Sequence, residues 1–339
     1  MEKIKVELHD KLSYMMKRKF YDGTIRAFFK FSGPLDKNIF SQALKYMIDE
    51  IPILHSSFKY NFINPYWQVK EYDITDILSF EESSNPEELA NIYMLDTLTE
   101  DSISRVKAKV IYNTKISILL ILIDHQCVDG IDFKYFLKTL IKKYNSLINK
   151  KEEVIVKKGP RNINQIYHDF STIDKIKAKN LITYKKPNNH LCFPWYPKTK
   201  DDSNLIVRVK MNSNDFSIMK KKLQEKNATV TDALLSTLIS FMYEKLDNNE
   251  LFSVASVVDL RRHLKEPDLL TGLTNYSSLM GVTVNKNEDI NEVLNEVATI
   301  TKKEKANKFL GLTGLPLLKL GFKYLPFFIG VPIVEKNYV

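Results

Sequence analysis

Cysteine is scarce in this sequence: Cys127 and Cys192 are the only two among 339 residues. Two thiols cannot form the disulfide framework on which small secreted domains depend. The beginning of the chain also lacks the charged, apolar and small-residue succession of a secretory leader. Both absences lead us to expect a protein of the reducing cytoplasm, with a core large enough to be stable without crosslinks.

The sequence also has no long uninterrupted apolar run. Residues 309–334 come nearest, because they are rich in leucine and phenylalanine. Lys319 and Lys323 interrupt this stretch and three prolines would break a single helix, so it is a poor membrane span. We expect it to pack in the second half of the fold against a helix over residues 231–246, with contact to a membrane as the alternative.

Negative charge is the minority: 41 aspartates and glutamates face 50 lysines and arginines, and the formal net charge is +9. Most lysines lie singly among acidic residues, which solubility alone explains, while attraction of an anionic partner is the functional alternative. Nucleic acid is not the expected partner. The basic clusters at residues 157–158 and 220–222 are short, and no nucleic-acid-binding motif accompanies them.

The clearest local pattern runs from residue 116 to residue 148. Residues 116–123 form an almost unbroken apolar run, rich in β-branched side chains and without charge, which predicts a strand buried on both faces. Residues 124–130 then form a polar turn. The apolar positions that follow recur at three and four residues, with lysines on the opposite side, and predict an amphipathic helix that ends near Asn149.

The polar turn contains a histidine and an aspartate four residues apart, His125 and Asp129. A short turn between a central strand and a helix can aim such side chains out of the sheet. Imidazole is the side chain best suited to accept a proton near neutral pH. The carboxylate could hold the backbone of the turn or orient the histidine. Gly130 can take a positive φ or allow close packing, which few other residues could do without strain.

Two other chemistries are weaker candidates at this turn. Cys127 lies two residues from His125, but a small, partly buried thiol explains it better than a nucleophile does. A metal site would need a third ligand at a recognisable spacing, and the sequence offers none, so we expect no bound metal.

Further strands and helices follow from periodicity. Residues 105–112 alternate, with Val106, Ala108, Val110 and Tyr112 expected inward and Arg105, Lys107 and Lys109 outward. Other strands are expected over residues 25–31, 53–60, 66–70, 205–211, 252–258 and 279–284. Helices are expected over residues 36–50, 86–95, 215–225, 231–246 and 289–308, with Asp36, Asp215 and Thr231 as N-caps. Residues 1–26 show no clear period.

His125, Asp129 and Gly130 match the HxxxDG motif of a large superfamily. It contains chloramphenicol acetyltransferase, the condensation domains of nonribosomal peptide synthetases, and alcohol acetyltransferase-like and polyketide-associated acyltransferases. The resemblance covers nearly the whole chain, on residues 31–36, 51–58, 230–235, 258–264 and 275–277. It implies an α/β (α+β) fold of two chloramphenicol acetyltransferase-like lobes, each a mixed β-sheet with helices packed on it, with an active-site tunnel between the lobes.

The resemblance also implies a domain organisation. Residues 1–160 would form the N-terminal lobe that carries the motif, residues 161–200 a linker or crossover, and residues 201–339 the C-terminal lobe. The closing strands that the superfamily has in the second lobe are not found in this sequence, so we expect that lobe to be incomplete: either the sequence is a fragment, or a partner or a shortened fold completes the sheet. We therefore expect an open sheet edge there, through which the protein could self-associate.

The function implied by the resemblance is acyl transfer from a coenzyme A or other pantetheine thioester to a hydroxyl or amine. His125 would be the general base, Asp129 a structural residue paired with an arginine, and Gly130 a backbone residue. Acyl-coenzyme A or an acyl carrier protein and a small acceptor alcohol or amine are the expected partners, and no bound cofactor is expected. A stand-alone condensation enzyme with a carrier-bound donor and a non-catalytic binding or scaffold protein are the alternatives.

Supporting positions depart from the superfamily pattern. A second histidine often precedes the catalytic one, and here that position is Asp124. Condensation domains often have an arginine where this chain has His55. The partner of Asp129 therefore stays open, and the candidates are His55, Arg261, Arg262 and backbone amides. The resemblance also suggests Asn275 as a residue that lines the tunnel near the donor.

Overall fold

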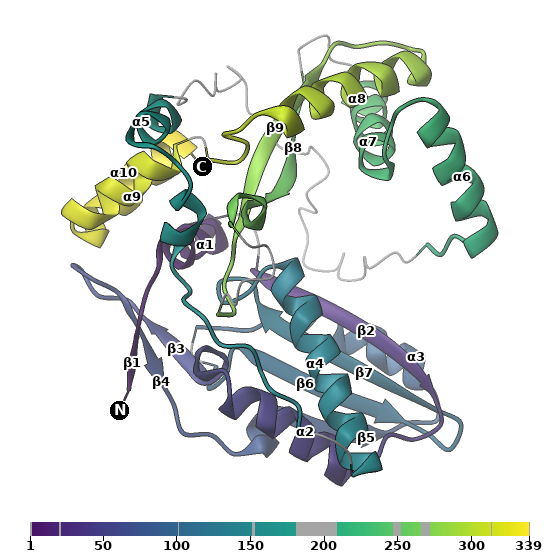
Figure 1. The fold of residues 1–339 in the computed structure, drawn as a ribbon. Helices are drawn as coiled ribbons and strands as arrows, with labels where there is room; N and C mark the ends of the chain where they lie inside the picture. Colours follow the sequence, from purple (N-terminus) through teal and green to yellow (C-terminus); the bar gives the residue numbers. More distant parts are fainter. Residues whose placement is uncertain are drawn as a thin grey trace. The chain divides into compact units, whose positions relative to one another are not determined.

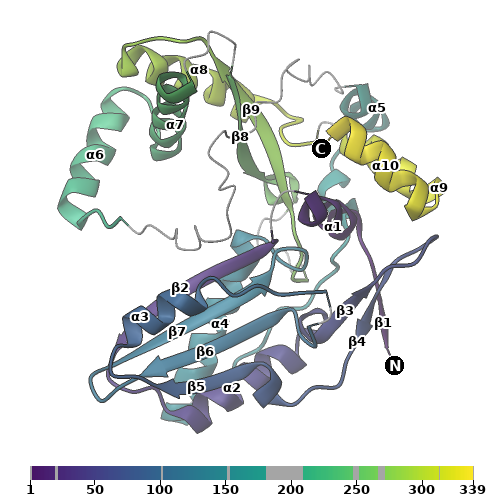
Figure 2. The same cartoon turned by 180° about the vertical axis from the view of Figure 1, so that it is seen from behind.

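The computed structural model describes residues 2–19, 22–100, 102–150, 153–180, 209–246, 252–265, 272–312 and 314–338. The chain divides into two compact units, which can be followed in Figures 1 and 2. Unit 1 comprises Met1–Phe170, Arg261–Tyr276 and Leu317–Val339, and unit 2 comprises Ser171–Leu260 and Ser277–Pro316. Both units combine helices with β-strands, which confirms the expected α/β class.

Part of the expected organisation lies outside the described residues. This holds for Cys192, for most of the crossover expected before residue 200, and for most of the strand expected over residues 205–211. The lobe boundaries near residues 160 and 200 therefore stay predictions.

The larger sheet of unit 1 has four strands in the order β2-β7-β6-β5 (Thr24–Ser32, Ile116–Asp124, Val106–Tyr112 and Leu78–Glu82). β7 pairs antiparallel with β2 on one side and, through a hairpin, with β6 on the other. Every β7 residue after Ile116 is buried, as its apolar run predicts. β5 pairs parallel to β6 at the edge. The sequence pattern does not predict β5, because only Leu78 of its five residues is buried and no apolar alternation results.

Helices cover both faces of this sheet. α2 (Lys37–Asp49) and α4 (Gly130–Asn149) lie on one face, and α3 (Pro86–Tyr93) lies on the other (Figures 1 and 2). α2 confirms its prediction down to the cap, because the Asp36 carboxylate accepts a hydrogen bond from the Ile39 backbone N–H at 2.9 Å. α4 also has its predicted bounds. The strand that leads to His125 is thus held in a closed core.

A second sheet of unit 1 has three short antiparallel strands in the order β1-β4-β3 (Lys3–Lys5, Tyr66–Val69 and Ser56–Lys59). β3 starts three residues later than expected, because Pro52 opens a 3-10 turn over Pro52–His55. α1 (Leu8–Lys19) packs on this sheet, with the Tyr14 ring stacked on Phe58 at 4.7 Å. The sequence does not reveal α1, because buried polar residues break its apolar period.

The end of the chain departs from its prediction. α9 (Leu315–Tyr324) and α10 (Phe327–Tyr338) follow each other, and from Leu317 onward they belong to unit 1. The Phe327 ring lies 5.9 Å from Tyr14 of α1 and 5.7 Å from Tyr60. The expectation that this segment packs against residues 231–246 is therefore wrong. Its hydrophobicity indicates burial, but complementary aromatic side chains on α1 and the β3–β4 hairpin decide where it packs.

In the part of unit 2 that the structure describes there are a two-stranded antiparallel sheet, β8-β9 (Phe252–Asp259 and Ser277–Val284), and four helices. These helices are α5 (Thr172–Asn180), α6 (Ser213–Glu225), α7 (Val230–Leu246) and α8 (Ile290–Ala306). Buried side chains of α7, α8 and the two strands form its core. On α7, Leu235, Ile239, Met242 and Tyr243 face this core, whereas Leu234 and Leu238 are exposed.

Two predicted helix caps in unit 2 are wrong. The Asn212 side chain caps α6 by accepting from the backbone N–H of Asp215, and Asp215 itself lies in the first turn. α7 begins before Thr231, where Thr229 and Asp232 exchange hydrogen bonds. Among the described helices, none combines the length and the apolar character that a membrane crossing requires.

Candidate active site

His125 is the first residue after β7. Its backbone N–H donates to the carbonyl oxygen of Gly23, just before β2, at 2.8 Å. Gly23 has φ +66°, a conformation that glycine adopts without strain. The end of the central strand and the neighbouring turn thus fix the backbone of His125, while its side chain stays half-buried.

Asn275 holds the side chain of His125 in place. Its Nδ2 lies 3.1 Å from His125 Nδ1, 3.1 Å from the His125 carbonyl oxygen and 3.2 Å from the Ser13 hydroxyl. Asn275 is buried. Its amide thus lies against His125, and its expected place along the tunnel near the donor stays a prediction. Three segments of unit 1 that are distant in sequence therefore meet at the Asn275 side chain.

Asp129 begins α4 and is almost completely buried. One carboxylate oxygen accepts from the backbone N–H groups of Ile131 and Asp132, both at 3.0 Å. The other accepts from Arg261 Nη1 at 2.6 Å and from the Tyr276 N–H at 2.8 Å. Of the partners considered for Asp129, the structure therefore shows Arg261 and backbone amides. His55 is engaged elsewhere, with its Nδ1 2.7 Å from the carbonyl oxygen of Lys70.

Asp132 is a second buried carboxylate on the same arginine, and sequence reasoning missed it. It lies 2.9 Å from Arg261 Nη2 and accepts from the Thr274 backbone N–H at 2.7 Å. Burial raises its pKa to about 7, against the opposing effect of Arg261. The sequence does show an aspartate at the third position of the helix that begins at Gly130. A carboxylate in a first helical turn is usually interpreted as a solvent-exposed group that interacts favourably with the helix dipole, so this aspartate did not stand out.

Residues 272–276 form a strap that ties these groups together. The backbone of Gly272 lies directly against the backbone of Gly159. A Cβ added at position 272 would lie 2.3 Å from the Gly159 carbonyl oxygen, so a larger residue would clash there. Arg161 Nε donates to the carbonyl oxygen of Leu273 at 2.7 Å, and the guanidinium pairs with buried Asp10 at 2.8 Å. The strap presents its backbone to Asp129 and Asp132 and its Asn275 side chain to His125.

Asp124, the last residue of β7, stabilises the turn that contains His125. Its carboxylate is buried, accepts from the Gln126 N–H at 3.0 Å, and pairs with Lys17 at 3.2 Å and Arg105 at 3.3 Å. Arg105 was expected to point outward, and that expectation is wrong. It is 1% exposed, because the ion pair with Asp124 makes burial of an arginine possible.

Cys127 lies in the turn between β7 and α4 and Gly130 is the first helical residue of α4, and their environments show what each residue can contribute. Gly130 is exposed, it is not among the residues with positive φ, and a Cβ added to it would meet no atom within 4 Å. The structure therefore uses neither the positive φ nor the close packing that a glycine allows at this position. Cys127 is fully buried, and burial raises its thiol pKa well above the usual range, with Asp124 adding to the effect. A buried neutral thiol is a poor nucleophile.

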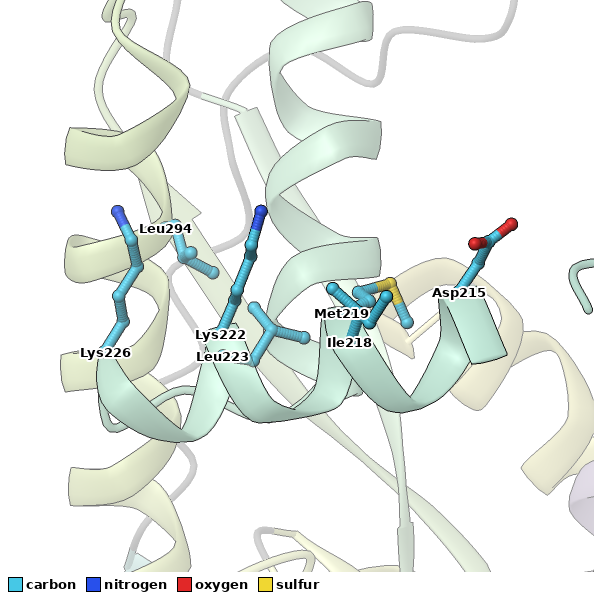
Figure 3. Close-up of a pocket in the computed structure, with 7 residues that line it drawn as sticks. All are labelled: Asp215, Ile218, Met219, Lys222, Leu223, Lys226 and Leu294. Atoms are coloured by element: carbon cyan, nitrogen blue, oxygen red, sulfur yellow. The ribbon is translucent and has the colours of Figure 1, made fainter. Parts of the chain in front are cut away.

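An open groove of about 340 Å³ lies on unit 2, between α6 and α8. Figure 3 shows the side chains that line it. Leu223, Met219 and Leu294 line it, and Lys222 and Lys226 extend along it. It shares no residue with the site around His125. Its walls are apolar, with Lys226 at one end and Asp215 at the other. None of its lining residues is a histidine or cysteine, so it offers no acid–base chemistry near neutral pH.

No protein-family model matches the sequence, and no curated protein matches it significantly. Solved structures do match. The first condensation domain of the calcium-dependent antibiotic synthetase, in complex with a substrate analogue, gives a TM-score of 0.67 over 91% of this chain and 75% of its own, at 13% identity. SgcC5 from Streptomyces globisporus gives 0.65 over 94% and 76%, at 10% identity. Polyketide synthase associated protein 5 from Mycobacterium tuberculosis gives 0.64 over 94% and 76%, at 14% identity.

These structural matches show which fold the chain has. The chain has the condensation-domain fold, which is the fold that the HxxxDG resemblance implies. A fold of this kind does not by itself assign a reaction, so the function has to be argued from the groups around His125.

Proposed function

We propose that this protein is an acyltransferase that moves an acyl group from a coenzyme A thioester to the hydroxyl or amine of a small acceptor, with His125 as the general base. The position of His125 carries the proposal. Its half-buried ring follows a buried central strand and is held at Nδ1 by Asn275. A titratable group in a fixed orientation on a rigid scaffold is what proton transfer requires.

One histidine can supply both the base and the acid of this reaction. The ring would take the proton of the acceptor O–H or N–H while the acceptor atom bonds to the thioester carbonyl carbon. When the intermediate breaks its C–S bond, the same proton would pass to the departing sulfur. The products are the acylated acceptor and free coenzyme A. No covalent acyl-enzyme is needed, in keeping with the burial of Cys127.

The nitrogen that acts as base depends on the Asn275 amide. With Nδ2 toward the ring, Nδ1 is an acceptor and the ring hydrogen lies on Nε2. With Oδ1 toward the ring, Asn275 would accept from Nδ1–H and from the Ser13 hydroxyl, which leaves Nε2 free to take a proton. Hydrogen-bond networks, not the outline of the side chain, decide between these orientations. The His125 carbonyl oxygen lies 3.1 Å from the same Asn275 atom and can only accept, so the network favours Nδ2 toward the ring, with the ring lone pair on Nδ1.

A thiol-release assay tests the proposal. The protein is incubated with acyl-coenzyme A of several chain lengths and with panels of alcohols and amines, and both free thiol and product mass are followed. We expect acceptor-dependent release that is lost in His125→Ala and kept in His168→Ala, since His168 is exposed in the same unit. Equal activity of both variants would remove His125 as the base.

A carrier-protein-bound donor is the second candidate. The condensation domains among the similar structures favour it. The same assay with an acylated carrier protein in place of acyl-coenzyme A separates the two donors. If neither donor is consumed with any acceptor, the protein is better described as a binding or scaffold protein of this fold.

A further inference from the structure

Unit 1 carries an exposed aromatic and aliphatic surface that the candidate active site does not use. We call it the aromatic patch, and its main members are Tyr60, Phe62, Ile63, Tyr324, Leu325 and Phe328. Phe62 and Tyr324 are each 68% exposed. Contiguous surface of this kind usually marks an interaction site.

The patch is one surface because two distant segments are joined at their backbones. The N–H groups of Phe327 and Phe328 donate to the carbonyl oxygens of Ile63 and Phe62, at 3.2 and 3.1 Å. The Phe62 and Phe328 rings meet edge to face at 6.0 Å. Phe327 is buried behind them and anchors the junction of α9 and α10. The exposed rings therefore stand on a packed base.

Charge distinguishes the possible occupants. The two segments that build the patch, residues 59–66 and 315–334, contain no aspartate or glutamate but three lysines. Lys323 is exposed and lies 5.1 Å from the Tyr324 ring. Exposed Arg18 lies 5.9 Å from Tyr14, the ring against which Phe327 packs. Aromatic and leucine side chains beside basic groups are typical of segments that lie in the headgroup region of an anionic membrane.

We propose that the aromatic patch docks unit 1 onto the surface of an anionic lipid bilayer. The exposed rings would insert at the headgroup level, with Lys323 and Arg18 near lipid phosphates. α9 and α10 are too short to cross a bilayer, and Pro332 lies inside α10, so the mode is surface attachment. The proposal does not depend on the reaction at His125.

Vesicle co-sedimentation tests this proposal. The 339-residue protein is mixed with phosphatidylcholine vesicles, with or without phosphatidylglycerol, at low and high salt. We expect binding to the anionic vesicles only, weakened by salt. The triple variant Phe62→Ser, Tyr324→Ser, Phe328→Ser should lower the bound fraction about tenfold or more. The matched control Phe216→Ser, Leu234→Ser removes exposed apolar side chains of unit 2 and should bind like the wild type.

The single variant Lys323→Glu keeps the test valid if the triple variant does not fold. It changes an exposed side chain and should weaken anionic-vesicle binding without lowering the melting temperature. Absence of vesicle binding, or equal binding of the wild type and both patch variants, overturns the proposal. A wild-type dimer that the patch variants convert to a monomer, without vesicle binding, would show a second copy of the chain as the occupant.

Discussion

Asn275 Nδ2 lies 3.1 Å from His125 Nδ1, although the two residues are 150 positions apart in the chain. The strap that carries Asn275 is itself held by Asp132, Asp129 and Arg161. The orientation of the histidine ring therefore depends on a network of buried ion pairs and not only on the turn in which it lies. A side chain held in this way needs little reorganisation when the reaction begins.

Asn275→Ala should lower kcat of acyl transfer by about 10–100-fold, because the His125 ring loses its fixed orientation. KM should change little. Asn275→Asp is the informative companion: its carboxylate can accept from Nδ1–H and would stabilise the protonated ring. The acidic limb of its kcat–pH profile should therefore move to higher pH. If that profile coincides with the wild-type profile, Asn275 has only a structural role.

Asp129→Ala should reduce the free energy of unfolding by about 3–5 kcal/mol, because it leaves Arg261 without one of its two buried carboxylates. Asp36→Ala is the matched control. Asp36 caps α2 in the same way but is exposed, and a lost cap costs about 1 kcal/mol. Urea denaturation measures both. Equal losses in the two variants would mean that the pair with Arg261 adds nothing to stability.

Asp132 should make stability depend on pH. Its pKa is raised to about 7 in the folded protein, while an unfolded aspartate titrates near 3.8. Between these values the folded state binds more protons than the unfolded state, so the free energy of unfolding should fall as pH rises from 5 to about 8. Asp132→Asn should flatten this part of the profile. A wild-type profile that rises over the same range would contradict the burial argument.

Gly130→Ala should leave the free energy of unfolding within about 0.5 kcal/mol of the wild type. An added Cβ meets no atom within 4 Å, and the backbone there is not left-handed. Thermal and urea melts test this directly. A large destabilisation would show that glycine is needed for the turn after all. Loss of acyl transfer at unchanged stability would instead place a substrate beside this residue.

The local part of the site could be predicted from sequence. A strand, a polar turn and a helix follow each other between residues 116 and 149, and periodicity within a short window identifies all three. The partner of Asp129 could not be chosen, because Arg261 lies 132 positions away and several cations were compatible. Asn275 could be named from the resemblance, but its contact with His125 depends on the path of the strap.

Burial of charge is the second limit of sequence patterns. Alternation in β6 places Arg105 outward, and only its partner Asp124 explains why it lies inside. Asp10 likewise breaks the apolar stripe of α1, because it is buried with Arg161. The end of the chain shows a third limit, since hydrophobicity predicts that residues 317–338 pack but not which surface they pack against.

The dependence of acyl transfer on His125 is the most direct test of this account. It is measured as kcat/KM for the best acyl-coenzyme A and acceptor pair across pH, for wild type, His125→Ala and His168→Ala. We expect His125→Ala to lose about a hundredfold or more at every pH at which the base is required, with its melting temperature unchanged. His168→Ala should follow the wild-type profile. A folded His125→Ala variant with near wild-type kcat/KM would contradict the assignment of His125 as the base.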